Sequence, residues 1–153
     1  MNMPNMSIKL YQHVHSNIFK NLNDLAWREM LIAGKDAKSA IEKGEINHLG
    51  RPKIAVVADG AWSKRSYKTK YNALSGVICI IGARTKKVIF FGVRNKYCCV
   101  CQLAENCGEL TQKHVCFKNW NSASTAMEAD IIFEGFKQSL DMHNIIYAQL
   151  IGK

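Results

Sequence analysis

A chain of 153 residues, 48% of them hydrophobic and only two of them proline, is long enough to bury one core and too apolar for a disordered protein. No basic region precedes an apolar run at the N-terminus, and apolar runs such as residues 77–81 are far too short to cross a bilayer. We therefore expect an intracellular protein without a membrane partner. In a reducing compartment, its six cysteines are expected to be thiols or metal ligands rather than disulfides.

The net charge of +9 comes from one segment of the chain. Nine lysines and arginines and no acidic residue lie between Gly60 and Ala104, whereas basic and acidic residues elsewhere are equal in number, at 12 each. Clustered Lys and Arg attract the phosphates of nucleic acid and release their counterions. The segment therefore predicts a surface for a polyanion, with a solvated basic sheet edge as the alternative.

The predicted elements begin with an irregular lead-in over residues 1–19, which shows no clear period. Residues 21–43 carry apolar side chains at helical spacing, which predicts an amphipathic helix. Residues 54–58 form a short apolar run rich in β-branched side chains, typical of a strand that is buried on both faces. Asp59 and Gly60 are expected to end that strand.

Two further strands are predicted over residues 73–81 and 88–93, and the short connection between them favours an antiparallel hairpin. The cysteine-rich residues 98–116 have no strong period and are interpreted as an insertion. Residues 125–142 predict a second helix and residues 145–151 a fourth strand. The order of helix, three strands, insertion, helix and strand indicates an α/β fold of the α+β type.

The most specific spacing in the sequence is formed by two close pairs of metal-ligand residues, Cys98 and Cys101, then His114 and Cys116. Four such ligands can complete a tetrahedral Zn²⁺ site, and the closing of all four positions implies a structural site. The polar insertion between the pairs has little apolar surface to bury, so metal ligation would supply its folding energy. Cys99 and Cys107 are competing ligands, and Cys79 is expected in the core. The alternative is a set of ordinary buried thiols.

Asp59 follows a predicted buried strand, and two hypotheses fit it. An Asp-Gly pair after a strand is common turn chemistry. In a two-metal phosphoryl-transfer site, an Asp at the end of a central strand bridges two Mg²⁺ ions, which activate the attacking oxygen and stabilise the leaving one. Such a site needs further carboxylates. Glu128 is the candidate, with a capping box begun by Thr125 as its alternative role.

Aromatic and basic residues alternate just downstream of Asp59. Lys and Arg can neutralise phosphates while an aromatic ring stacks on a base, so this segment could hold a DNA strand end. The alternative is a half-buried strand with its aromatic side chains turned inward. The candidate nucleic-acid-binding residues are Trp62, Lys64, Arg65, Lys68 and Lys70.

Long segments of the sequence resemble the Mutator-like transposase domain, a member of the RNase H-like DDE superfamily. The resemblance covers residues 6–152. It rests on four stretches among others: VVADGAWSKRSY at residues 56–67, GVRNKYC at residues 92–98, HVCFKNW at residues 114–120 and MEADII at residues 127–132. Matches of this length are far more specific than a short motif.

The resemblance implies an incomplete RNase H-like core, with three antiparallel strands, a zinc-knuckle insertion over residues 97–120, a helix and a parallel fourth strand. Asp59 then corresponds to the first acid of the catalytic set. In the family an Asp-Gly-Asp motif follows the fourth strand, whereas this chain has Lys153 there and ends. The second and third acids and a preceding DNA-binding domain are therefore expected to be missing.

These inferences place an N-terminal segment and helix in residues 1–50 and a partial transposase core in residues 51–153. The leading hypothesis is a transposon-derived fragment of a nuclear transposase that holds structural Zn²⁺ and binds DNA without cutting it. Mg²⁺ or Mn²⁺ would act only in an intact family member. The expected partners are DNA and either the missing half of the transposase or a second copy. The alternatives are a zinc-dependent nucleic-acid-binding or interaction module without catalysis, and a fragment that does not persist as a folded protein.

Overall fold

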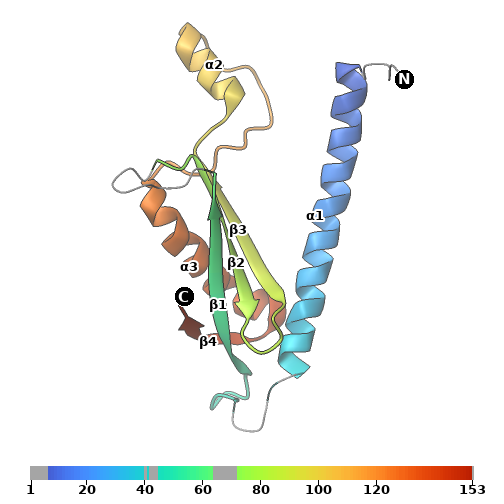
Figure 1. The fold of residues 1–153 in the computed structure, drawn as a ribbon, viewed down its shortest axis with the longest axis vertical. Coiled ribbons are helices and arrows are strands. Elements are labelled where there is room, and N and C mark those ends of the chain that lie inside the picture. The colour runs from blue at the N-terminus through green and yellow to red at the C-terminus, as the bar shows by residue number, and fades with distance from the viewer. Residues whose placement is uncertain (1–6, 40, 42–44, 64–71, 153) are drawn as a thin grey trace, which may run out of the picture.

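The computed structural model describes residues 7–39, 41, 45–63 and 72–152. Its elements are α1 (Ile8–Ser39), β1 (Lys53–Trp62), β2 (Ser75–Gly82), β3 (Val88–Asn95), α2 (Cys99–Cys107), the single turn η1 (Ser124–Ala126), α3 (Met127–His143) and β4 (Ile146–Ile151). Figure 1 shows α3 against the sheet, α1 rising beside β3, and α2 standing beyond the end of β3. Among the described residues, no helix has the length and apolar character needed to cross a bilayer.

The four strands form one mixed sheet in the order β3-β2-β1-β4. β2 pairs antiparallel with both β1 and β3, whereas β4 lies parallel to β1 on its other side. The parallel pairing is possible because α3 carries the chain back along the sheet before β4 begins. The predicted arrangement of three antiparallel strands, a helix and a parallel fourth strand is thus confirmed.

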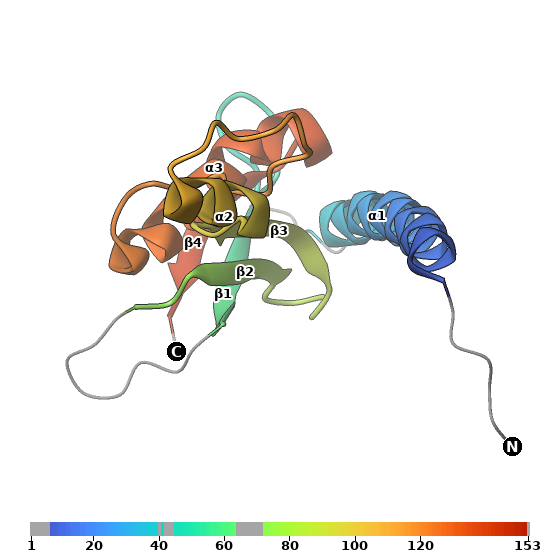
Figure 2. The same ribbon diagram turned by 90° about the horizontal axis from the view of Figure 1, so that it is seen from above.

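One face of the sheet packs against α3 and forms the core. Burial alternates along β2, and Ile78 and Ile80 are completely buried beside Ile131 of α3. Two glycines allow the close approach, because a Cβ atom at Gly92 or Gly135 would collide with these isoleucines. The helix therefore lies directly on the strands, as Figure 2 shows.

The opposite face of the sheet is more open. In Figure 2 no described helix lies over it. Its half-buried side chains include Val57, Val77, Cys79 and Ile81. Cys79 was predicted to lie in the core, and it lies instead on this face, where burial first and Asp59 second raise the pKa of its thiol.

The helix α1 is longer than predicted, because residues 8–19 are helical rather than an irregular lead-in. The low helix propensity of residues such as His13 and Asn17 concealed the helical spacing of their neighbours. Within α1 the buried positions of the described residues are Met30, Ala33, Gly34 and Ala37. Only the last third of the helix therefore rests on the molecule, and Figure 1 shows the remainder standing clear of the sheet.

Two predictions about element ends were wrong. β1 continues through Asp59 and Gly60 to Trp62, because residues 60–62 still pair with β2, so cross-strand pairing overrides the turn propensity of Asp-Gly. α3 begins at Met127 without a side-chain cap rather than with a capping box at Thr125. The hydroxyl that is used there belongs to Ser124, which donates to the carbonyl of Ala73 at 2.7 Å.

Candidate functional site

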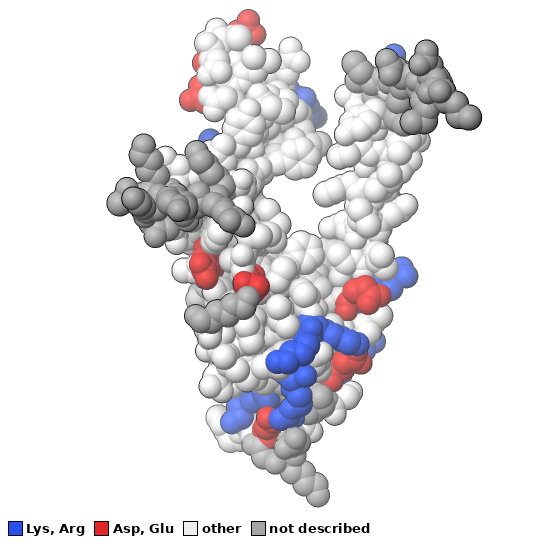
Figure 3. All heavy atoms as spheres, viewed as in Figure 1, with Lys and Arg blue, Asp and Glu red and all other residues white. Residues whose placement is uncertain are grey.

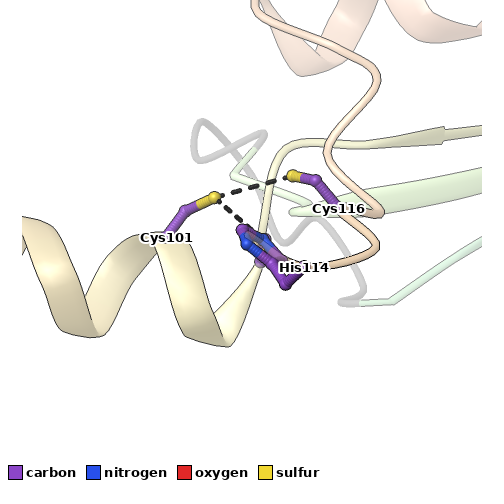
Figure 4. A group of neighbouring side chains, drawn as sticks. Cys101, His114 and Cys116 are labelled. Atoms are coloured by element: carbon purple, nitrogen blue, oxygen red, sulfur yellow. Dashed lines mark hydrogen bonds between the residues drawn. The ribbon is translucent and has the colours of Figure 1, made fainter. Parts of the chain in front are cut away.

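Four side chains of the cysteine-rich insertion converge on one point. The ligand atoms of Cys98, Cys101, His114 and Cys116 all lie within 4.8 Å of one another. Figure 4 shows three of them, with Sγ of Cys101 3.4 Å from Nε2 of His114 and 3.5 Å from Sγ of Cys116. A tetrahedral Zn²⁺ with bonds of about 2.1 to 2.3 Å places its ligand atoms about 3.5 to 3.8 Å apart. Three thiols and one imidazole at this spacing fit zinc.

Cys98 owes its position to the start of α2. It is the N-cap residue of that helix, so its sulfur lies at the end where the free backbone N–H groups of Val100 and Cys101 are. These N–H groups, that of Cys101 first, lower the pKa of the Cys98 thiol to about 6. The turn thus presents a thiolate, which is the form that binds metal.

His114 is held in the orientation that a metal ligand needs. Its Nδ1 lies 2.8 Å from the carbonyl oxygen of Gln112 and donates to it, so Nε2 is turned toward the three sulfur atoms. That carbonyl first, and the sulfur of Cys98 second, raise the pKa of His114 to about 9. The sulfur of Cys116 is the main cause that raises the pKa of Cys101 to about 11. Bound metal would displace the protons that these two groups hold.

The competing cysteines lie elsewhere. Cys99 and Cys107 are exposed on α2 and are not members of the Cys/His cluster. The structure therefore brings together the four residues that the spacing paired. Residues 97–120, which contain the cluster, are called the zinc module below.

Two asparagines that the sequence analysis did not single out join the zinc module to the sheet. Asn119 accepts from the backbone N–H of Asn95 at 2.6 Å and donates to the carbonyl of Val93 at 2.9 Å. The Asn95 side chain in turn donates to the carbonyls of Tyr97 and Phe117. The two ends of the module are thus clamped to the end of β3. The sequence feature that could have indicated this role is an asparagine at each end of the cysteine-rich insertion.

Arg94 was counted with the basic segment, but it serves the interior of the fold. Its guanidinium donates to Asp130 at 2.6 Å and to Glu134 at 2.5 Å, both on α3. It also lies over the ring of Trp120, 5.9 Å from the ring centroid. Because its side chain is only 15% exposed, Arg94 ties β3 to α3 and to the module rather than facing phosphates.

Of the other basic residues of this segment, the structure describes Arg84, Lys86, Lys87 and Lys96, and two of them form ion pairs. Arg84 pairs with Glu45 at 3.0 Å, and Lys87 pairs with Asp36 at 2.6 Å. Figure 3 shows blue lysine and arginine side chains beside red carboxylates at the lower end of this face. Four candidate DNA-binding residues lie outside the described residues: Lys64, Arg65, Lys68 and Lys70.

Asp59 and Glu128 line one hollow of about 330 Å³, bounded by β1, the start of α3 and the end of β4. Both residues are exposed, and Asp59 lies opposite Cys79 on the neighbouring strand. Its Oδ1 accepts the backbone N–H of Gly60 at 3.1 Å. Within the described part of the chain, the Cys/His cluster is the only group of three or more metal-ligating side chains. The hollow therefore holds two carboxylates but not a complete two-metal site.

Trp62 also lines this hollow, but its ring is half-buried and packs against the core. It occupies the space over Gly76, where a Cβ atom would collide with the ring. This is the arrangement that the sequence left open as the alternative to base stacking. The aromatic side chain turns inward, toward the face that α3 covers.

Comparison with known proteins gave one finding. A family model described as Mutator-like transposase matches residues 1–152. Neither the curated proteins nor the solved structures that were searched contain a match. The matched residues include the whole sheet, the zinc module and the hollow at Asp59.

Proposed function

Because the chain belongs to the Mutator-like transposase family, we propose that it forms part of a DNA transposase core in which Asp59 is a metal-binding acid. The observation that carries this proposal is the place of Asp59 on the central strand β1, exposed at the hollow that Glu128 also lines. The strand order β3-β2-β1-β4, with β4 parallel to β1, supports an RNase H-like core. In such enzymes, carboxylates hold the divalent ions that activate the attacking oxygen.

The residues present at the hollow do not fit a two-metal site. Two carboxylates line it in the described part of the chain, and two-metal clusters are held by more. Further acids from outside the described residues, or from another chain, would have to complete it. We therefore propose no cleavage step for this chain by itself, and we expect Asp59 and Glu128 to bind a single Mn²⁺ or Mg²⁺ weakly.

The zinc module fits a structural role in this proposal. A closed set of four protein ligands leaves no open position for a substrate or for water, which is typical of structural zinc. The hydrogen bonds of Asn119 join the module to the end of β3, and Arg94 joins the end of β3 to α3. The metal would therefore hold the module in place beside the sheet.

DNA is the proposed partner, and a nuclear location follows from that proposal. Family membership and the net charge of +9 support it. Lys64 and Arg65 belong to the basic segment and lie five and six residues after Asp59 along the chain. Replacing both by alanine is expected to weaken binding to DNA duplexes and to reduce the salt slope of the binding constant by about 1 to 2. Fluorescence anisotropy over a series of salt concentrations measures both effects.

An assay for metal binding and cleavage tests the role of Asp59. Mn²⁺ is expected to broaden the NMR signals of residues around the hollow, and Asp59→Asn is expected to remove this broadening. Asp141→Asn, on an exposed part of α3, serves as the matched control. Supercoiled plasmid should remain intact with Mg²⁺ or Mn²⁺. Nicking by the purified chain that disappears in Asp59→Asn would contradict the expected lack of cleavage, and unchanged broadening in that variant would contradict metal binding at Asp59.

A second candidate function is a zinc-dependent nucleic-acid-binding module without catalysis. The specific observation in its favour is that the Cys/His cluster is complete, whereas the acidic hollow is not. On this hypothesis Asp59→Asn leaves DNA binding unchanged and Mn²⁺ does not bind at the hollow. Cys98→Ser, in contrast, should abolish DNA binding, because the module loses its metal.

A further inference from the structure

The first two-thirds of α1 carry an apolar surface that nothing in the described structure covers. From Leu10 to Leu25, seven large apolar side chains are between 36% and 61% exposed, and Leu10 and Phe19 lie to either side of the other five. Those five share one face of the helix: Tyr11, Val14, Ile18, Leu22 and Leu25. This set is called the α1 stripe. Figure 1 shows that this part of the helix stands apart from the sheet. Most of the stability of a helix in a protein comes from packing of its apolar face, so this face is expected to have a partner.

The geometry of the helix separates the α1 stripe from the surface that docks on the rest of the molecule. At 3.6 residues per turn, the five stripe residues fall within an arc of about 80°. The buried residues Met30, Ala33 and Ala37 fall on a face turned by about 90° from that arc. On the line of the stripe, Glu29 follows Leu25. The stripe therefore ends there and is a second surface rather than a continuation of the docked one.

Charged residues leave the α1 stripe free for a close apolar contact. The residues Lys9, Lys20 and Asp24 fall on the opposite side of the helix. Between Ile8 and Asn23 the charged side chains are Lys9 and Lys20, so repulsion along the helix is small. This charge distribution fits an apolar helix as partner and does not fit a nucleic acid, which needs basic residues on the contact face.

The spacing between the residues of the α1 stripe is the same when it is read in either direction along the helix. From Tyr11 to Leu25 the steps are three, four, four and three residues, which is a symmetric series centred on Ile18. Two copies that cross antiparallel about Ile18 would pair Tyr11 with Leu25 and Val14 with Leu22. An interface with a twofold axis requires such a self-complementary surface, whereas an unrelated partner does not. We propose that the chain forms an antiparallel dimer through the α1 stripe, with the twofold axis at Ile18.

The mass of the full zinc-loaded chain in solution tests this proposal. Sedimentation equilibrium is expected to give a species of twice the chain mass of 17.3 kDa. Ile18→Glu places two like charges beside each other at the axis, and it is expected to weaken self-association by on the order of a hundredfold. Leu31→Glu is the matched control, since Leu31 is 44% exposed on the opposite side of the helix. It should leave the dimer intact.

Mixing experiments separate loss of the interface from misfolding. Ile18→Glu and Ile18→Lys should each be monomeric, keep their zinc, and form a heterodimer when mixed in equal amounts. For the orientation, Val14→Glu mixed with Leu22→Lys should associate, whereas Val14→Glu mixed with Val14→Lys should not. The reverse result would overturn the antiparallel arrangement.

Three results would overturn the dimer itself. They are a monomeric wild-type chain, a dimer that survives Ile18→Glu, and charge-swapped variants that fail to associate when mixed. If the monomeric wild-type chain instead bound phospholipid vesicles and Ile18→Glu abolished that binding, the α1 stripe would belong to a membrane surface.

Discussion

The sheet with α3 and the zinc module are stabilised by different means. In the sheet, Ile78, Ile80 and Ile131 are completely buried and pack against one another. In the zinc module, the apolar side chains of Leu103, Leu110, Val115 and Phe117 are 64–96% exposed. The module therefore has almost no apolar core, and a metal held by its four clustered side chains would take that place. Loss of the metal should therefore unfold the zinc module without unfolding the sheet, and a defect in the core should destabilise the sheet without releasing the metal.

Removal of the metal should give the largest difference between the two regions. Cys98→Ser, or a strong chelator, is expected to unfold the zinc module, because structural zinc contributes on the order of 10 kcal/mol of apparent binding free energy. Amide hydrogen exchange should show loss of protection in α2 but not in β2. Cys107→Ser is the control, and it should retain one zinc ion per chain by mass spectrometry. Retention of metal in Cys98→Ser would contradict the ligand assignment.

A cavity in the core should destabilise the sheet and leave the zinc module with its metal bound. Ile80→Ala is expected to lower the free energy of unfolding of the sheet by about 2 to 5 kcal/mol, measured by urea denaturation. Val93→Ala, on the open face, should cost less than about 1 kcal/mol. Zinc content should stay the same in both variants below the unfolding transition. If Ile80→Ala lost zinc before it unfolded, the two regions would not be independent.

The pH dependence of zinc binding should be steep. Between the pKa of Cys98, about 6, and that of His114, about 9, His114 and Cys101 hold protons that zinc must displace. Apparent zinc affinity should therefore rise with pH in this range by about a hundredfold per pH unit, since at least two protons are released. Below pH 6 the rise should be steeper, because Cys98 is protonated too. A competition titration with a chelator of known proton affinity measures this, and a flat profile would contradict it.

The smallest effect is expected where the two regions meet. Asn119→Ala removes the hydrogen bonds to Asn95 and Val93, and it should cost about 1 to 3 kcal/mol. Zinc should remain bound, while hydrogen exchange at the end of β3 increases. Asn121→Ala, at an exposed position close by, is the control. If Asn119→Ala and Asn121→Ala gave the same stability and the same hydrogen exchange, the hydrogen bonds of Asn119 would not couple the module to the sheet.

The prediction from sequence was most successful where the signal is local. The hydrophobic runs of β2, β3 and α3 predicted these elements within a few residues, and the two close ligand pairs predicted the residues that cluster. It failed where distant pairing decides the outcome. β1 extends past Asp59 because β2 lies beside it. The direction of Trp62 was left open by the sequence, and the ring turns inward because Gly76 leaves room for it. The start of α1 was missed because weak helix formers interrupt its apolar spacing.

The sequence by itself determined the order of the four strands with α1 and α3, the four Cys and His residues that cluster in the zinc module, and the resemblance to the transposase family. These follow from periodicity and short spacings, which act within a few residues. Only the tertiary structure decided that Arg94 serves α3 and Trp120 rather than DNA, and that Asp59 and Glu128 share one hollow. Such partners lie far apart along the chain, and pairing across the sheet brings them together.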